Sequence, residues 1–315
     1  MRYDFAPLEG LTDSIYRKLH HQYFPGVQRY YMPFISPTMH HSLTTKERRD
    51  LPPADSVAFQ AVPQILTRNP EDFLWAAGCC QDMGYPLVNL NMGCPSGTVV
   101  SKGKGAGMLR DLDALALFLD EIFEKSPLPI SLKTRIGIAS PEEFPAILEL
   151  INRYPAQEII IHPRVRQAFY KGAVNLEVFA YALQYAKMPV SYNGDLCTHL
   201  EIQEMEERFP NAQSMMIGRG LIGNPGMLTP GGTTPQKLAD FHDALLEEYC
   251  STFGSRRNAM FRLKENWRHL LCLFENSDTL GKKLRKATDY EEYVSITREI
   301  IFGLSMRNEL EPDWR

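Results

Sequence analysis

The sequence lacks several features that would assign it to a common class of protein. Its six cysteines are scattered over 315 residues without a Cys-x-x-Cys pair, which argues against a zinc site and a disulfide framework. No apolar run approaches the roughly 18 residues that a membrane-spanning helix needs. The N-terminus has no basic region followed by an apolar one, so we expect no secretory signal. These absences predict a cytoplasmic protein with neither a metal nor a membrane partner.

Charge is balanced overall but unevenly distributed. Apolar residues make up 44% and charged residues 23% of the chain, as in ordinary folded proteins. The net charge is −4, yet residues 255–287 contain nine Lys or Arg and only three Asp or Glu, interleaved with Phe261, Trp267 and Phe274. A basic run is most often a solvated face. Within an acidic chain, however, this stretch is a candidate surface for nucleic acid.

Short apolar runs recur along the chain, each followed by turn residues and then by a helical pattern. Strands that alternate with helices imply a parallel sheet, and eight repeats predict a closed TIM (β/α)8 barrel. A doubly wound open sheet is disfavoured, because no Gly-x-Gly-x-x-Gly follows the first run. The predicted strands are residues 3–7, 28–32, 57–65, 87–91, 130–134, 158–162, 190–193 and 214–217.

A cluster of Pro, Gly and Thr at residues 229–235 has the composition of a linker. Beyond it, the pattern is helical throughout. We therefore predict a barrel domain over residues 1–230 and a smaller all-helical domain over residues 235–315. The predicted C-terminal helices are residues 236–253, 257–274, 281–287 and 289–302.

Cys94 follows the fourth predicted strand, in a loop interrupted by Gly93 and Pro95. Catalytic side chains collect at this end of barrel strands. A thiol with an ordinary pKa of roughly 8.5 is mostly protonated at neutral pH, so it can donate a proton. A lone cysteine is more often structural, and the interpretation depends on the polar residues that end the other strands.

Polar residues end most of the predicted strands and would share one barrel mouth. Glycines after the seventh and eighth strands let backbone N–H groups approach a phosphate, and Arg219 adds a planar charge. Lys133 is placed to neutralise an electron-rich ring or a developing negative charge. The segments concerned are 6–13, Gln64, 89–94, Lys133 and Arg135, His162 and Arg164, 193–195 and 217–220.

These segments together resemble the tRNA-dihydrouridine synthases, and the match extends in order through the whole barrel. The motifs are Ala-Pro-Leu-Glu-Gly-Leu-Thr-Asp (6–13), Asn-Leu-Asn-Met-Gly-Cys-Pro (89–95), Gly105-Ala106, Lys-Thr-Arg-Ile-Gly (133–137), His162 with Arg164, Gln167, Tyr170 and Gly172, Asn-Gly-Asp (193–195), and Ile-Gly-Arg-Gly (217–220) with Asn224-Pro225. The helical C-terminal stretch also resembles that family's tRNA-binding domain.

The resemblance implies an FMN-dependent enzyme that reduces the C5=C6 bond of uridine in tRNA, with NADPH as reductant. By family analogy, hydride passes from the flavin N5 to C6, and Cys94 supplies the proton to C5. The implied cofactor-binding residues are Pro7, Leu8, Gln64, Lys133, His162, Asn193, Gly194, Asp195, Gly218 and Arg219. The implied or expected substrate-binding residues are Asn91, Arg164, Lys102, Lys104, Lys264 and Arg268, and a monomer is the default state.

The chain departs from the family pattern at three places. Asn89 stands where the family usually has Asp, so a negative group near the site is lost. Pro163 follows His162 where Gly is usual, and Leu8-Glu9 replaces Met-Ala or Met-Glu. These departures concern positioning rather than the class of reaction. Two alternatives stay open at this point: an FMN barrel that reduces a small pyrimidine or enone, and a non-enzymatic RNA-binding barrel.

Overall fold

The structure, a computed structural model, describes residues 1–314 and divides into two compact units. Unit 1 comprises Met1–Pro7, Gln28–Gly194 and Met205–Met216. Unit 2 comprises Leu8–Val27, Asp195–Glu204 and the chain from Ile217 onward. Arg315, the last residue of the predicted helical domain, lies outside the described residues.

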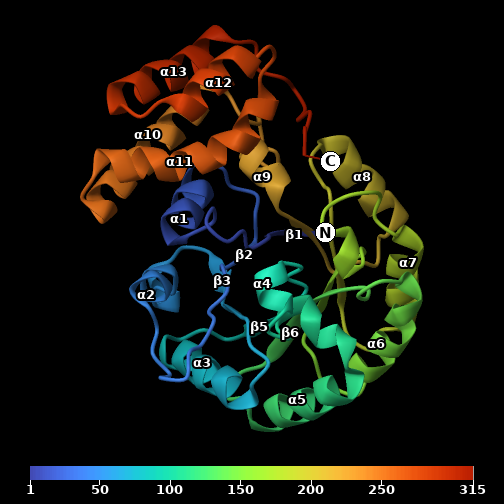
Figure 1. Ribbon diagram of the computed structural model, residues 1–315. Helices are drawn as coiled ribbons and strands as arrows, with labels where there is room; N and C mark the ends of the chain where they lie inside the picture. Colours follow the sequence, from blue (N-terminus) through green and yellow to red (C-terminus); the bar gives the residue numbers. More distant parts are fainter. Residues whose placement is uncertain (315) are drawn as a thin grey trace. The chain divides into compact units, whose positions relative to one another are not determined.

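Unit 1 is built on a parallel sheet whose strands follow the order β3-β2-β1-β9-β8-β7-β6-β5-β4 (Figure 1). Pro63, which has no N–H to donate, divides one extended segment into β3 and β4. Because β3 pairs with β2 and β4 pairs with β5, the two edges of the sheet meet at this segment and the barrel is nearly closed. The predicted barrel, followed by a helical region, is confirmed. The strands are β1 Arg2–Phe5, β2 Arg29–Tyr31, β3 Gln60–Val62, β4 Gln64–Ile65, β5 Val88–Met92, β6 Ile130–Arg135, β7 Ile159–His162, β8 Val190–Asn193 and β9 Ser214–Ile217.

Helices alternate with these strands, and α3, α5, α6 and α7 pack in succession around the sheet (Figure 1). Each of α3, α5 and α7 begins at an Asn or Asp side chain that accepts a hydrogen bond from the first turn, which fixes where the helix starts. The helices are α2 Thr45–Asp50, α3 Pro70–Asp82, α4 Gly97–Val100, α5 Leu112–Lys125, α6 Phe144–Ile151, α7 Leu176–Tyr185 and α8 His199–Arg208, with short 3-10 turns η1 Ala54–Ser56, η2 Gly105–Arg110, η3 Pro141–Glu143 and η4 Arg166–Ala168.

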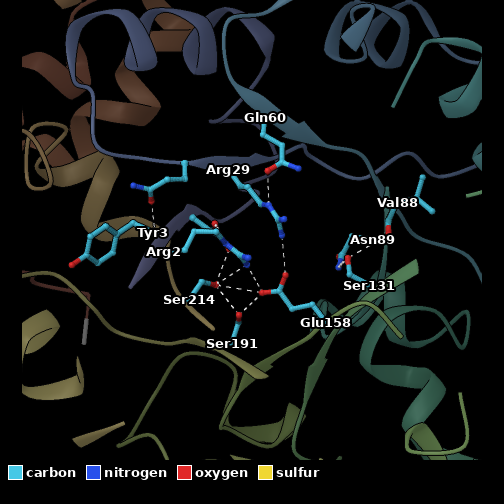
Figure 2. Close-up of polar contacts among 12 residues, drawn as sticks. Arg2, Tyr3, Arg29, Gln60, Val88, Asn89, Ser131, Glu158, Ser191 and Ser214 are labelled. Carbon is cyan, nitrogen blue, oxygen red and sulfur yellow. Dashed lines mark hydrogen bonds and ion pairs between the residues drawn. The ribbon is translucent and has the colours of Figure 1, made fainter. Parts of the chain in front are cut away.

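The barrel interior of unit 1 is layered. At the N-terminal ends of the strands, Arg2 and Arg29 form ion pairs with the buried Glu158, and Ser191 and Ser214 donate to the same carboxylate (Figure 2). An apolar layer follows, made of Ala6, Tyr31, Val62, Leu87, Ile160 and Met216. Glu158 directly precedes β7 and lies two residues before Ile160, and His162 lies two residues after Ile160 on the strand. The apolar layer therefore separates the charged cluster from the polar residues at the C-terminal ends of the strands.

Unit 2 is helical, and its core is aromatic. Phe241 on α10 packs against Tyr16 and Phe24, with ring centroids 5.5 and 5.2 Å apart. Residues that the sequence assigns to the barrel domain thus contribute to this core, while the predicted domain limits stay a prediction. The helices are α1 Ser14–Tyr23, α9 Arg219–Gly223, α10 Pro235–Phe253, α11 Arg256–Leu270, α12 Asp278–Lys286 and α13 Tyr290–Gly303, with the 3-10 turn η5 Leu271–Leu273.

Candidate active site

Within unit 1, strand register brings the predicted catalytic residues to one sector of the barrel mouth. Asn91 on β5 pairs with Lys133 on β6, and Arg135 on β6 pairs with His162 on β7. Cys94 lies two residues beyond the end of β5. Because the carboxyl ends of parallel strands meet at one edge, these side chains share the position at which barrel enzymes place their chemistry.

The Cys94 loop is held from three sides. The carbonyl of Gly93 accepts from Arg135 Nε at 2.9 Å, and the carbonyl of Cys94 accepts from the backbone N–H of Ala106 at 3.0 Å. Gly105 has φ +57°, and a Cβ there would lie 2.8 Å from the Cys94 oxygen and 3.0 Å from its Cβ. Only glycine fits this close approach, so the basic, glycine-rich loop packs directly on the cysteine.

The side chain of Asn91 also holds the Cys94 loop through hydrogen bonds. Its Oδ1 accepts from the backbone N–H of Gly93 at 3.0 Å and of Cys94 at 2.7 Å. Its Nδ2 donates to Gln64 Oε1 at 2.7 Å, and Gln64 Nε2 donates to Asn89 Oδ1 at 2.8 Å. Hydrogen bonds therefore connect Gln64, Asn91 and the cysteine loop in one network. Asn89 also belongs to this network, a connection that the sequence analysis did not predict.

Lys133 is a buried amine at the barrel mouth, without an acidic partner in the described part of the chain. Burial and the charge of Arg135 lower the pKa of Lys133 to about 7, and the Cys94 side chain acts in the opposite direction. Part of the side chain remains exposed, but the amine lies deep enough for burial to dominate. Among residues 1–314, no carboxylate forms an ion pair with this amine. An anionic or electron-rich ligand beside Lys133 would restore its full charge.

His162 and Arg164 form a buried pair at the end of β7. Arginine can only donate, so the contact of 3.1 Å between Arg164 Nη1 and His162 Nε2 makes that ring nitrogen an acceptor. Arg164 also donates from Nε and Nη2 to the carbonyl of Gly172. The departure at Pro163 is accommodated by a tight turn, in which the N–H of Arg164 donates to the carbonyl of His162 at 2.7 Å. The predicted role of Arg164 toward substrate stays a prediction.

Arg135, which the sequence analysis placed at the barrel mouth without giving it a role, completes this sector. Burial lowers the pKa of Arg135 to about 10, so it remains charged at neutral pH. Its guanidinium lies 5.3 Å from the ring centre of the half-exposed Tyr170, a cation–π arrangement. The motif Lys-Thr-Arg could have indicated that Arg135 belongs to the site, because Arg135 follows Lys133 by two residues and so lies on the same face of β6.

The residues predicted to bind a phosphate are divided between the units. In unit 1, Asn193 donates to the carbonyl of Met216 at 2.8 Å, and a Cβ on Gly194 would lie 3.0 Å from Val174. In unit 2, Arg219 pairs with Asp195 at 3.3 Å. Arg219 also donates to the carbonyl of Trp314 at 3.3 Å, with the Trp314 ring 5.8 Å away. No pattern in the sequence predicts the contact with Trp314.

The remaining residues predicted to bind the cofactor follow β1 and lie at the start of α9. Pro7 is the last residue of its segment in unit 1. Leu8 begins a turn in unit 2, where its N–H donates to Thr12 Oγ1 at 2.9 Å. Gly218 immediately precedes α9, and the following Gly220 has no room for a side chain, because a Cβ would lie 2.2 Å from the carbonyl of Leu196.

The predicted tRNA-binding residues have different surroundings. Lys102 is exposed, and Lys104 Nζ donates to Ser36 Oγ at 3.4 Å. Exposed Arg68 lies beside Gly103, so it adds a third charge to this basic loop of unit 1. In unit 2, Arg268 is exposed, with Glu265 3.7 Å away. Lys264 donates to the carbonyls of Arg285 and Ala287 at 2.8 and 2.7 Å.

No group of three or more His, Cys, Asp or Glu side chains within residues 1–314 is arranged to hold a metal ion. None of the helices in that part of the chain is long and apolar enough to cross a membrane.

Comparison with known proteins places these motifs in a family context. The family model for dihydrouridine synthase matches residues 4–299. The tRNA-dihydrouridine synthase B of Proteus vulgaris is 30% identical over 222 residues, which cover 70% of this chain and 67% of that protein. The tRNA-dihydrouridine synthase B of Pasteurella multocida is 26% identical over 247 residues, which cover 78% and 73% of the two chains.

Solved structures also resemble the chain. Morphinone reductase superposes with a TM-score of 0.50 at 10% identity, covering 72% of this chain and 84% of the other. A morphinone reductase variant in complex with tetrahydroNAD gives a TM-score of 0.51 at 10% identity, covering 72% and 85%. At this identity the similarity shows the barrel fold alone.

Proposed function

The chain belongs to the dihydrouridine synthase family, and from that membership we propose an FMN-dependent oxidoreductase that reduces specific uridines of tRNA to 5,6-dihydrouridine. NADPH is the proposed reductant. The observation that supports this best is the joining of the Cys94 loop with Lys133 in one sector of the unit 1 barrel. Neither alternative from the sequence, a small-molecule reductase or a non-enzymatic RNA-binding barrel, is favoured by a feature of its own.

The donor set of unit 1 fits a flavin. The amine of Lys133 is buried and its pKa is lowered, as expected for a group whose charge is stabilised only when an electron-rich ring binds beside it. Gln64 and His162 would contact the ring from the neighbouring strands, and Pro7 and Leu8 belong to the segment proposed to pass beside it. Asn193, Gly194, Asp195, Gly218 and Arg219 stay the residues proposed for the flavin phosphate.

The chemistry that bound FMN would supply is hydride donation to C6 of the uracil ring. Hydride addition leaves enolate charge at C5 and the adjacent carbonyl, so a neutral acid is needed nearby. We assign that acid to Cys94: its S–H bond breaks as the C5–H bond forms, and the thiolate regains a proton from solvent. Lys133 and Asn91 would stabilise the developing charge from β6 and β5.

The substrate would be held largely through its phosphates. Lys102 and Lys104 in unit 1, and Lys264 and Arg268 in unit 2, are the proposed contacts, and such contacts make binding sensitive to salt. The target uridine must leave its stack to react, as tRNA loops permit. An enzyme that acts on tRNA is expected in the cytoplasm, and we expect a monomer.

The proposal is tested by absorption spectroscopy and by Cys94→Ala. Purified protein should show flavin bands that bleach when NADPH is added anaerobically, and tRNA lacking dihydrouridine should restore them. Cys94→Ala should keep the flavin and its reduction by NADPH, but slow reoxidation by tRNA by about 10²- to 10⁴-fold, the usual contribution of a general acid. A colourless protein that does not take up FMN would exclude the proposed enzyme. Reoxidation of Cys94→Ala at the wild-type rate would exclude Cys94 as the acid.

A further inference from the structure

A chain of four side chains on the neighbouring strands β4, β5 and β6 of unit 1 leads to the cysteine loop. Ser131 on β6 accepts from Asn89 Nδ2 at 2.9 Å, as Figure 2 shows, and Asn89 accepts from Gln64. Gln64 in turn accepts from Asn91, which accepts from the backbone N–H of Cys94. We call Ser131, Asn89, Gln64 and Asn91 the amide relay.

The direction of the amide relay is fixed by its end at the cysteine. The backbone N–H groups of Gly93 and Cys94 can only donate, so Asn91 must turn its oxygen toward them and its NH2 toward Gln64. Gln64 must then accept with its oxygen and donate with its nitrogen. That nitrogen faces Asn89, so Asn89 must accept there and donate to Ser131.

Burial makes each link of the amide relay hard to replace. Gln64, Asn89 and Ser131 have no exposed surface, and Asn91 is 7% exposed. Water is therefore poorly placed to satisfy a group that loses its partner. A buried donor or acceptor that loses its partner destabilises the folded chain, so a break at one link favours reorientation of the next.

The far end of the amide relay explains why an amide suits position 89. The Ser131 hydroxyl donates to the carbonyl of Val88 at 3.3 Å (Figure 2), so its oxygen receives a hydrogen from Asn89. A carboxamide offers an acceptor to Gln64 and a donor to Ser131 at once. A carboxylate keeps the first contact but lacks the second, and it would bury a charge.

We propose that Asn89 is a positioning residue, which orients the Gln64 amide and through Asn91 fixes the backbone that presents the Cys94 thiol. This proposal rests on the proposed role of Cys94 as the acid. Asn89 itself contacts neither the cysteine loop nor its backbone. Its effect passes through one acceptor atom, Oδ1, and that atom is what the variants below add or remove.

The test compares Asn89→Ala, which removes the acceptor, with Asn89→Asp, which keeps it. In stopped-flow experiments with reduced enzyme and tRNA, Asn89→Ala should slow reoxidation about 10- to 100-fold, the usual loss for a misplaced catalytic group. Reduction by NADPH should slow less than reoxidation, because it depends on Gln64 beside the flavin but does not use the thiol. Asn89→Asp should recover most of the lost rate.

A second measurement does not require turnover. The protein as purified is treated with iodoacetamide, and mass spectrometry measures the alkylation of Cys94 separately from that of the other five cysteines. Asn89→Ala should change the rate and pH profile of this alkylation, and Asn89→Asp should restore them. If Asn89→Ala fails to fold, Asn89→Leu removes the same acceptor with a side chain of similar volume and should change the alkylation rate in the same direction.

Asn69→Ala is the matched control. Asn69 caps α3 by accepting from the backbone N–H of Asp72 at 3.1 Å, so its loss destabilises unit 1 without touching the amide relay. It should leave both readouts unchanged. The proposal is overturned if Asn89→Ala matches wild type in both, or if Asn89→Asp is as impaired as Asn89→Ala. Cys94→Ala is measured in parallel to separate this outcome from failure of the proposed function. If Cys94 is not the acid, Cys94→Ala also reoxidises at the wild-type rate; if only the role of Asn89 is wrong, Cys94→Ala remains slow.

Discussion

Arg262 on α11 forms an ion pair with Asp13, with 2.7 Å between Nη2 and Oδ2. Asp13 is buried, and its other oxygen accepts from Tyr249 at 2.9 Å and from the backbone N–H of Tyr16 at 3.0 Å. One carboxylate thus caps α1 and joins it to α10 and α11. Asp13 therefore helps to fix the position of α1 within unit 2, together with the aromatic core.

We predict that Arg262→Ala destabilises unit 2 strongly, because it leaves the Asp13 carboxylate buried without its cation. Breaking a buried pair in this way costs about 3–5 kcal/mol. Arg256→Ala is the control: its pair with Glu291 spans 3.6 Å between highly exposed side chains, and such pairs contribute about 1 kcal/mol or less. Urea denaturation followed by circular dichroism measures both, and equal losses would contradict the prediction.

Lys133 predicts a pH dependence of stability. Its pKa is about 7 in the folded protein and about 10.5 in an unfolded chain. Between these values the unfolded state binds more protons, so the free energy of unfolding rises with pH through this window, by at most about 1.4 kcal/mol per pH unit. Below pH about 7 both states are protonated and the contribution is constant.

The measurement compares wild type with Lys133→Met in urea at several pH values between about 6 and 10. Groups common to both proteins cancel in the difference. The difference in unfolding free energy should shift with pH in favour of the wild type above pH about 7, where its buried amine is increasingly neutral. A difference that stays constant across this range would show that Lys133 is charged in the folded state.

The fold could largely be predicted from the sequence, because each strand is a short apolar run bounded by turn residues. The predicted run 57–65 is the main difference. The strand begins only at Gln60, and Pro63 divides it, since proline cannot donate to a neighbouring strand. The motif residues of unit 1 were predictable for the same reason: strand register follows from the period of two.

What the sequence did not reveal depends on partners that are distant along the chain. The nine basic residues between 255 and 287 include Arg262. Because Arg262 pairs with Asp13 inside unit 2, its charge is not available to bind tRNA. The same holds for Arg219 and Trp314. The substitution of Asp by Asn89 suggested a lost charge, and only the positions of Gln64 and Ser131 show that the amide has a use of its own.

Lys264 and Arg268 are both predicted to strengthen tRNA binding, but their surroundings differ. Lys264 donates to the last carbonyls of α12 and its C-cap, and this helix contains Lys282, Lys283, Arg285 and Lys286. Favourable interaction at a helix C-terminus contributes about 0.3–1 kcal/mol. The Arg268 side chain is 71% exposed and available to a phosphate.

We therefore expect the two alanine variants to weaken tRNA binding by different routes. Arg268→Ala should reduce the slope of log affinity against log salt by about one, as loss of one phosphate contact does, and leave stability unchanged. Lys264→Ala should lower the stability of unit 2 measurably, because α12 loses its cap, and weaken tRNA binding through the four basic residues of that helix. Lys125→Ala on α5, an exposed lysine paired with Glu121, is the control and should alter neither quantity. Fluorescence titration with tRNA at four salt concentrations, together with thermal melting, separates the two routes. Unchanged affinity and salt slope in Arg268→Ala would remove α11 from the tRNA surface.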